Sequence, residues 1–317
     1  MTRYRYLTCD VFTDRAFCGN PLAVLPDARG LTEAQMQSIA REFNYSETTF
    51  VLPPDDPRHA ARVRIFTPGG ELPFAGHPTL GTAFVLASTG ALPPEARQIV
   101  FEEGVGPVPV AIFRDGGRVT HCRLTAARLP EAGPPPPGLA ALARMLSLAD
   151  GEVLDAAACW SCGVPFLVVP LAHAGALARC ALDLPLWREL LVGYPTQMVY
   201  PVARLGELHW RVRMFAPGAG VAEDPATGSA AAAFAGWLAR ELPQPRDGTL
   251  AVRLEQGVEM GRPAELHVEF DRSAGRVTAV RVGGAAVLIA EGTLAVQVAA
   301  APSPPAALPW SPPAALS

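Results

Sequence analysis

Polar and apolar residues alternate over several short stretches of the first half, which is the pattern of half-buried β-strands. The stretches lie at residues 4–12, 22–25, 62–66, 98–113 and 118–124, with a break at Asp115-Gly116-Gly117 before the last. The run from Leu31-Thr32-Glu33 to Phe43 predicts a helix with Thr32 as its N-cap. The segment N-Y-S-E-T-T-F-V-L is expected to lead from a loop into a strand, and the apolar run that begins at Gly76 is expected to be a helix.

The second half repeats this pattern. A helix is expected over 139–148, and a long Ala-rich helix is expected from just after Asp224-Pro225 to about Arg240. Strands are expected at 163–171, 197–202, 209–215, 249–254, 264–270, 277–283 and 286–297. Between the halves, 129–138 (L-P-E-A-G-P-P-P-P-G) is the best linker candidate, because prolines stiffen a segment and prevent sheet pairing. A length of 317 residues suits two domains: an N-terminal half over 1–128 and a C-terminal half over 129–285. The proline-rich tail, 301–317, cannot build a core and is expected to be mobile.

One stretch of sequence occurs twice. Residues 64–83 read R-I-F-T-P-G-G-E-L-P-F-A-G-H-P-T-L-G-T-A, and residues 213–230 read R-M-F-A-P-G-A-G-V-A-E-D-P-A-T-G-S-A. Aligning Phe66 with Phe215 and Gly81 with Gly228 places His77 opposite Asp224. Two like-folded halves that pack as pseudo-twofold partners would bring both turns to one cleft, where small ligands are usually bound.

Each copy ends at the start of an apolar helix. Thr79 or Thr82 in the first, and Thr227 or Ser229 in the second, are candidate caps. A helix N-terminus offers free N–H groups and a positive dipole end, which suits a carboxylate or phosphate. If both helices point into one cleft, that cleft favours an anionic substrate.

Three polar residues are candidates for chemistry. An Asp at a helix start, such as Asp224, should stay ionised and orient a hydroxyl or amine of the substrate. His77 is suited to orienting the substrate or relaying a proton near neutral pH. Glu47, between a helix and a strand, is either a general acid/base or a plain surface carboxylate, and spacing alone does not decide.

Composition excludes several function classes. The net charge is −4 and no basic stripe is present, so nucleic acid is not an expected partner. All basic residues are Arg, which rules out Schiff-base chemistry through a Lys side chain. No apolar run is long enough to span a bilayer and no leader is visible, so a cytoplasmic protein without a membrane partner is expected. The six cysteines are expected to be reduced, and the isolated Cys159-Trp160-Ser161-Cys162 completes no metal site.

Several long motifs, in the right order up to about residue 297, resemble the PhzF-like family, which is named for an isomerase of phenazine biosynthesis. They are G-N-P-L-A-V (19–24), A-R-E-F-N-Y-S-E-T-T-F (40–50), the two copies at 64–83 and 213–230, and E-Q-G-V-E-M-G-R-P (255–263). The resemblance implies an α+β, diaminopimelate epimerase-like fold. In that fold each half is a sheet curled around one central helix, and the last strand, near 286–300, returns to the first half. A homodimer is expected from the family as well.

The same resemblance implies a cofactor-free, metal-free reaction like that of trans-2,3-dihydro-3-hydroxyanthranilate isomerase, which moves a proton between ring carbons. Glu47 would be the acid/base, and His77 and Asp224 would hold the substrate. Gly76, Thr227, Gly228 and Ser229 would be further contacts. Tyr45, where the phenazine enzyme has a leucine, leaves the substrate open.

Two alternatives stay open at this point. The first is an epimerase or racemase of a small amino or hydroxy acid that uses Glu47 with His77. A two-thiol racemase is disfavoured, because none of the six cysteines falls at the two turns. The second is a protein that kept the fold and binds a ligand or a partner without turnover.

Overall fold

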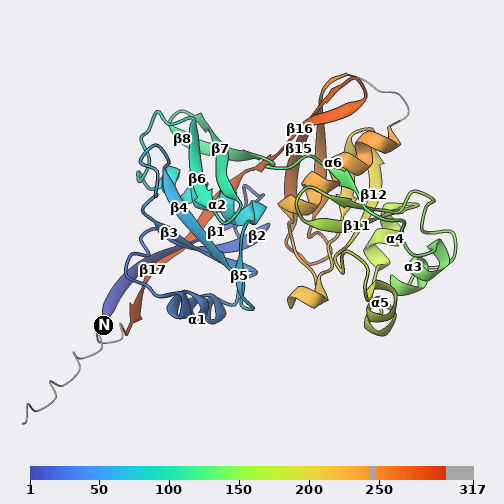
Figure 1. The fold of residues 1–317 in the computed structure, drawn as a ribbon, viewed down its shortest axis with the longest axis horizontal. Helices are drawn as coiled ribbons and strands as arrows, with labels where there is room; N and C mark the ends of the chain where they lie inside the picture. The colour runs from blue at the N-terminus through green and yellow to red at the C-terminus, as the bar shows by residue number, and fades with distance from the viewer. Residues whose placement is uncertain (243–246, 298–317) are drawn as a thin grey trace, which may run out of the picture.

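The protein forms two halves, each built on a curled sheet with a helix against its inner face (Figure 1). The computed structural model describes residues 1–242 and 247–297, so the tail predicted over 301–317 lies outside the described residues. The first half contains helices α1 (Glu33–Phe43) and α2 (Gly76–Ser88). Its strands are β1 (Thr2–Val11), β2 (Asn20–Leu25), β3 (Glu47–Leu52), β4 (Ala61–Phe66), β5 (Glu71–Leu72), β6 (Gln98–Glu103), β7 (Gly106–Asp115) and β8 (Arg118–Thr125).

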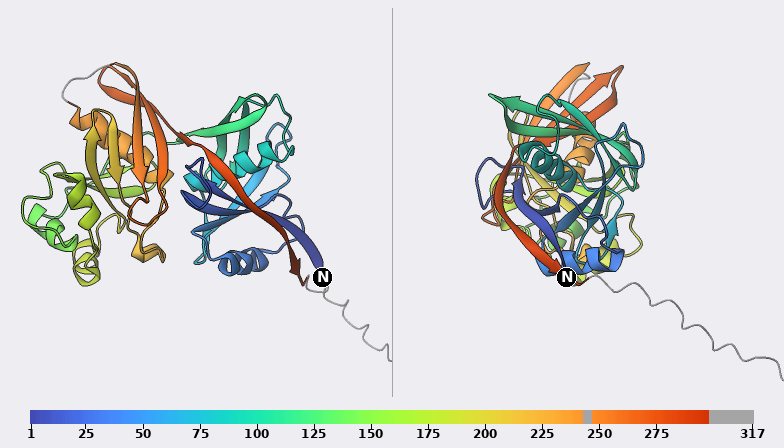
Figure 2. Two further views of the ribbon diagram at one scale, coloured as in Figure 1. Left: turned by 180° about the vertical axis from the view of Figure 1, so that it is seen from behind. Right: turned by 90° about the vertical axis from the view of Figure 1, so that its left-hand side faces the viewer.

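The second half has the longer helix α6 (Gly228–Glu241) at its centre and three short helices, α3 (Leu139–Met145), α4 (Ala174–Arg179) and α5 (Leu184–Leu191). Its strands are β9 (Glu131–Ala132), β10 (Ala158–Ser161), β11 (Pro165–Leu171), β12 (Val199–Gly206), β13 (His209–Val212), β14 (Gly248–Gln256), β15 (Ala264–Ser273) and β16 (Arg276–Gly284). The last strand, β17 (Ala286–Val296), runs back along the first half, where it pairs antiparallel with β1 (Figure 2).

The two halves have the same strand topology, as the repeated sequence suggested. In the first half β1 is antiparallel to β2, β2 parallel to β3, β3 antiparallel to β4 and β4 parallel to β6, followed by the antiparallel series β6–β7–β8. The second half repeats every step, with β10, β11, β12, β13, β14, β15 and β16 in the equivalent places. Helices α2 and α6 are the equivalent crossovers, between β4 and β6 and between β13 and β14.

The halves are joined where their last strands meet, because β8 pairs antiparallel with β16. The α+β fold with curled sheets around central helices is therefore confirmed. Helix α2 is buried along almost its whole length and packs on β1, β2, β3, β7, β8 and β17. Within the described residues, no helix combines the length and the apolar character needed to cross a membrane.

Local signals explain several elements. Helix α1 begins where expected: the Thr32 side chain accepts from the Gln35 N–H while the Gln35 side chain accepts from the Thr32 N–H, a complete capping box. The helix ends at Asn44, which adopts the left-handed conformation (φ 53°) that asparagine tolerates. Each of these contacts can be read from short-range sequence.

Three expectations about the elements were wrong. The stretch 98–113 is two strands, β6 and β7, that turn back at Gly104-Val105. The linker candidate 129–138 was expected not to pair with a sheet, but it contains β9, which pairs with β10. The pairing is possible because the residues that take part, Glu131 and Ala132, are not prolines. Strand β10 and the short helices α4 and α5 were not anticipated, since segments of four to eight residues carry little periodicity.

Candidate active site

The first turns of α2 and α6 meet head to head where the two halves join. A Cβ on Gly76 would lie 3.3 Å from the Cα of Gly228 and 3.5 Å from the backbone nitrogen of Ser229. Neither helix start has a side-chain cap, so the expectation that Thr79, Thr82, Thr227 or Ser229 caps them was wrong. The threonine hydroxyls lie instead against the Ala75 carbonyl, Thr49 and Asp224. Uncapped N–H groups at two opposed helix N-termini form a site suited to an anion.

Asp224 is buried beside the start of α6. Its carboxylate accepts from the Thr227 hydroxyl at 2.5 Å, from the Asn20 amide at 2.9 Å and from the Ser46 hydroxyl at 3.3 Å. Burial raises the pKa of Asp224 to about 6, and these donors oppose the rise. Because this pKa is still below 7, the ionised form dominates at neutral pH, as expected from the sequence, although desolvation moves the pKa upward.

Glu47 is the first residue of β3, and its side chain is 15% exposed. Its Oε2 is buried and makes no hydrogen bond. Burial raises the pKa of Glu47 well above its usual value, and the nearby charge of Asp224 adds to the rise. A carboxyl whose pKa is raised in this direction is better suited to give and take a proton near neutral pH than an ordinary carboxylate.

His77, in the first turn of α2, faces Glu47, with 3.4 Å between its Nε2 and the Oε2 of Glu47. Burial lowers the pKa of His77 to about 3, against a smaller opposing effect of a hydrogen bond to the Pro21 backbone. The imidazole is therefore neutral at physiological pH, and its role in orienting the substrate or relaying a proton stays a prediction. A neutral imidazole can still take up a proton at one ring nitrogen and release a proton from the other.

Two residues of the site were not singled out from the sequence. The Asn20 amide nitrogen, at the start of β2, lies 2.9 Å from Asp224 Oδ1, 2.9 Å from the Ala226 carbonyl oxygen and 3.3 Å from His77 Nδ1. It thereby ties the first half to the segment that precedes α6. Gln256, at the end of β14, donates to the Asp224 carbonyl and accepts from the Thr227 N–H. Asn20 is a polar residue at the start of an otherwise apolar strand, a signal that could have identified it, whereas Gln256 ends a strand that carries other polar residues and gives no such signal.

Two other features noted in the sequence are Tyr45 and the Cys159/Cys162 pair. Tyr45 packs against Phe43, with 6.0 Å between the ring centroids, on the side of α1. Cys159 and Cys162 are free thiols; Cys159 lies within β10, and Cys162 bonds to the Arg128 carbonyl. Burial raises the pKa of Cys162 to about 12, which leaves no thiolate for redox chemistry.

Comparison with known proteins identifies the family. The family profile described as phenazine biosynthesis-like protein (PhzC-PhzF) matches residues 9–292. The chain belongs to this family. An uncharacterized isomerase of Mesorhizobium japonicum is 43% identical over 303 residues, which cover 93% of this chain and 99% of that protein. The trans-2,3-dihydro-3-hydroxyanthranilate isomerase of Pseudomonas aeruginosa is 38% identical, over 91% of this chain and 98% of that protein.

Solved structures show the same fold. The PhzF-family phenazine biosynthesis protein of Bacillus anthracis superposes with a TM-score of 0.84 at 26% identity, over 93% of this chain and 100% of that one. A probable proline racemase of Agrobacterium radiobacter shares the fold at a TM-score of 0.59 and 13% identity, over 93% of both chains. This PhzF-family protein is an isomerase.

Proposed function

We propose that this isomerase moves a C–H proton on a small anionic, cyclic substrate without a cofactor, as trans-2,3-dihydro-3-hydroxyanthranilate isomerase does by its name. The observation that carries the proposal is the position of Glu47. Its buried carboxyl has a raised pKa and a free Oε2, and it lies beside His77 and the charge of Asp224 where the two uncapped helices meet. A proton-transfer site needs such a group within reach of a bound substrate.

In the proposed reaction one C–H bond of the ring breaks and another forms. The Glu47 carboxylate takes the proton from one carbon, the double bonds shift along the ring, and the carboxyl returns the proton to a second carbon. No electrons are lost or gained, so no oxidant or reductant is needed. Desolvation of Glu47 favours this cycle, because it moves the pKa toward neutrality and so balances the acid and base roles.

The hydrogen-bond arrangement around His77 supports a relay to Glu47. Both hydrogens of the Asn20 amide are used by Asp224 and Ala226, at 2.9 Å each, so Asn20 does not need His77 Nδ1 as an acceptor. His77 Nδ1 is then the atom that donates to the Pro21 backbone, which leaves Nε2 unprotonated and 3.4 Å from Glu47 Oε2, with no hydrogen bond between them in this structure. In this arrangement a neutral His77 faces Glu47 with a free acceptor nitrogen.

The substrate's carboxylate is proposed to bind the free N–H groups at the starts of the two helices. The absence of side chains on Gly76 and Gly228 lets the two helix starts approach each other closely, and Ser229 adds its N–H and hydroxyl. Asp224, mostly ionised at neutral pH, accepts a hydrogen bond from a hydroxyl or amine of the substrate, and Thr227 fixes the orientation of the Asp224 carboxylate. An anion with a neighbouring hydrogen-bond donor fits this combination.

The position of the acid also favours isomerisation over epimerisation. Inverting a stereocentre calls for proton donors on two opposite faces of the reacting carbon. Glu47 and His77 both come from the first half and contact each other at 3.4 Å, so they form one relay on one face. We therefore rank the epimerase alternative second, and the ligand-binding alternative third, since a binding protein needs no free acid.

The test is turnover of trans-2,3-dihydro-3-hydroxyanthranilate by the wild type, Glu47→Gln and the matched control Glu42→Gln, whose carboxylate is exposed on α1. We expect Glu47→Gln to lose activity while the control keeps it. NMR in heavy water separates the alternatives: a shifted double bond supports isomerisation, and exchange at a stereocentre with loss of optical rotation supports epimerisation. Ligand binding with no reaction and no exchange supports the binding protein.

The homodimer stays a prediction, which light scattering of the purified protein tests.

A further inference from the structure

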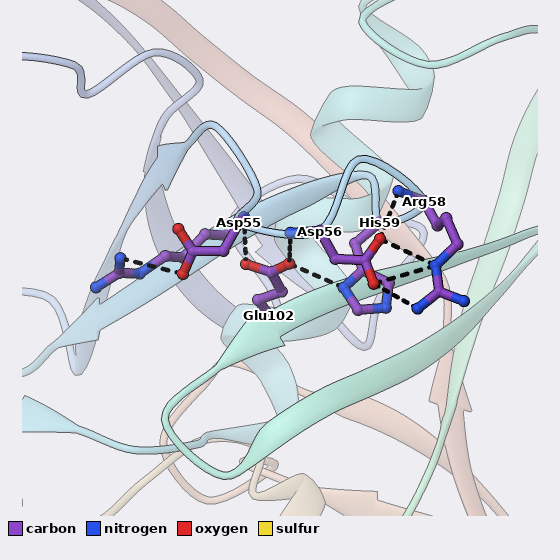
Figure 3. Close-up of polar contacts among 6 residues, drawn as sticks. Asp55, Asp56, Arg58, His59 and Glu102 are labelled. Atoms are coloured by element: carbon purple, nitrogen blue, oxygen red, sulfur yellow. Dashed lines mark hydrogen bonds and ion pairs between the residues drawn. The ribbon is translucent and has the colours of Figure 1, made fainter.

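Two neighbouring glutamates on β6 have opposite surroundings. Glu102 accepts from the backbone N–H groups of Asp55 and Asp56 and contacts His59 Nδ1 at 2.9 Å, and it holds the loop before β4 (Figure 3). These donors keep the pKa of Glu102 below its usual value. Glu103 points to the other face of the strand, where it is buried. The carboxyl of Glu103 has one hydroxyl neighbour, Thr79, and its Oε2 has no partner.

The hydrogen-bond pattern at Thr79 favours a protonated Glu103. The Thr79 hydroxyl oxygen lies 2.7 Å from the Ala75 carbonyl oxygen and 2.7 Å from Glu103 Oε1. Both distances are those of O–H···O hydrogen bonds, but a hydroxyl donates only one hydrogen. A carbonyl can only accept, so the Thr79 hydrogen goes to Ala75. Both contacts are complete hydrogen bonds when Glu103 is a carboxylic acid that donates to the Thr79 hydroxyl. Burial raises the pKa of Glu103 to about 8, against a smaller opposing effect of the Thr79 hydroxyl.

The contacts of Glu103 lead directly to the substrate-binding end of α2. Thr79 is in the first turn of this helix, and Ala75 is the residue before Gly76. The turn after Glu103 packs against the segment that leads into α2. The Val105 N–H donates to the Pro73 carbonyl, and a Cβ on Gly104 would lie 2.7 Å from Pro73 Cα. The end of β6 therefore fixes the backbone that presents the N–H of Gly76.

The charged groups on the surrounding elements are engaged elsewhere. On β4, Arg62 pairs with Asp55. Arg64, also on β4, pairs with Glu33 and with Glu71 of β5. On α2 the titratable group of the first turn, His77, faces Glu47. The part of β7 that pairs with the end of β6 is Gly106-Pro107-Val108-Pro109, which carries no charge. An ionised Glu103 would thus be an uncompensated negative charge within one turn of the helix end that receives the substrate's carboxylate.

We propose that protonated Glu103 is a positioning residue of the substrate site, which holds the start of α2 through Thr79 and Ala75, and that its ionisation prevents binding of an anionic substrate. This inference rests on the proposed function, because it takes Gly76 as part of the carboxylate site. Glu103 does not touch the reacting atoms, so its loss of a proton acts on substrate binding and not on the chemical step. Substrate binding accordingly weakens at alkaline pH, and the group that causes this, Glu103, is not one of the reacting groups.

The experiment measures the dissociation constant of trans-2,3-dihydro-3-hydroxyanthranilate by calorimetry between pH 6 and 10, in the Glu47→Gln background so that no turnover occurs. We expect binding to weaken about tenfold from pH 7 to pH 9, because the competent fraction falls as Glu103 ionises. Adding Glu103→Gln, whose amide still donates to Thr79, is expected to remove this pH dependence and to keep the affinity at pH 7. The control Glu102→Gln should keep the pH dependence.

Kinetics in the otherwise wild-type protein provide the second readout. Glu103→Gln should remove the alkaline rise of KM and leave kcat unchanged. A pH dependence that survives Glu103→Gln, or one that Glu102→Gln removes as well, overturns the inference. Failure of the compound to bind at any pH contradicts the proposed substrate instead. In that case infrared difference spectra decide on Glu103: a protonated-carboxyl band that is lost in Glu103→Gln supports the inference, and a band that is unchanged overturns it.

Discussion

Replacing Asn20 with alanine tests whether this amide joins the two halves of the site. The Asn20 amide donates to the Asp224 carboxylate and to the Ala226 carbonyl, both at 2.9 Å, and Asn20 is fully buried. A hydrogen bond to a charged group contributes about 1.5 to 3 kcal/mol, and leaving a buried carbonyl unsatisfied costs about 1 to 3 kcal/mol. The two effects together predict that Asn20→Ala lowers the free energy of unfolding by about 2.5 to 6 kcal/mol.

The loss should also depend on pH. The pKa of Asp224 is raised to about 6 in the folded state from an ordinary 3.8, because burial favours the protonated form. The folded state therefore gains stability from protonated Asp224 at low pH, and this contribution is lost as the pH rises through about 6. Removing the Asn20 donor raises that pKa further, because the carboxylate loses a partner. The destabilisation by Asn20→Ala should therefore be larger at pH 8 than at pH 5.

Urea unfolding at the two pH values measures both effects, with Ser46→Ala as the matched control. Ser46 donates to the same oxygen of Asp224 at 3.3 Å but is less buried, so its removal should cost less than 1 kcal/mol, roughly that of a weak hydrogen bond. A loss in Asn20→Ala that is no larger than in Ser46→Ala, or one that is independent of pH, would refute the reasoning.

Three further predictions concern the helix ends and the pH profile. Gly76→Ala should reduce activity at least about tenfold with little loss of stability, because the new Cβ would lie 3.3 Å from Gly228 Cα and would push the helix starts apart. The control Gly70→Ala, whose new Cβ would meet nothing within 4 Å, should be neutral in the same kinetic assay. Thr32→Ala should lower the free energy of unfolding by about 1 kcal/mol through loss of the α1 capping box and leave kcat unchanged, and a change in kcat would show that α1 acts on the site. The kcat/KM of the wild type should rise with pH through about 6 as Asp224 ionises, and a profile that is flat between pH 5 and 7 would contradict a role for the ionised carboxylate.

Much of the fold was accessible from sequence because its strongest signals are local or repeated. The capping residue Thr32 fixed the start of α1, and the two copies of one motif indicated that α2 and α6 are equivalent crossovers. The turn at Gly104 was missed because prolines 107 and 109 and their apolar neighbours extend the apparent strand across it. Such a turn depends on contacts with Pro73, which is distant in sequence.

The structure brings the predicted site residues together, their roles stay predictions, and their electrostatics were not predicted. Aligning the repeat paired His77 with Asp224, and the structure places both next to Asn20. Their pKa values could not be read from sequence, since burial decides them: it moves that of His77 to about 3 and that of Asp224 to about 6. Burial is a property of the assembled halves and not of either motif.

The most direct test of the account is the rate at which Glu47→Gln converts trans-2,3-dihydro-3-hydroxyanthranilate, compared with the wild type under saturating substrate. Removing a general acid/base predicts a fall in kcat of about 10² to 10⁴-fold, with the thermal unfolding of the variant showing an intact fold. If Glu47→Gln turns the compound over at the wild-type rate, Glu47 does not carry the proton, and the proposed mechanism is wrong.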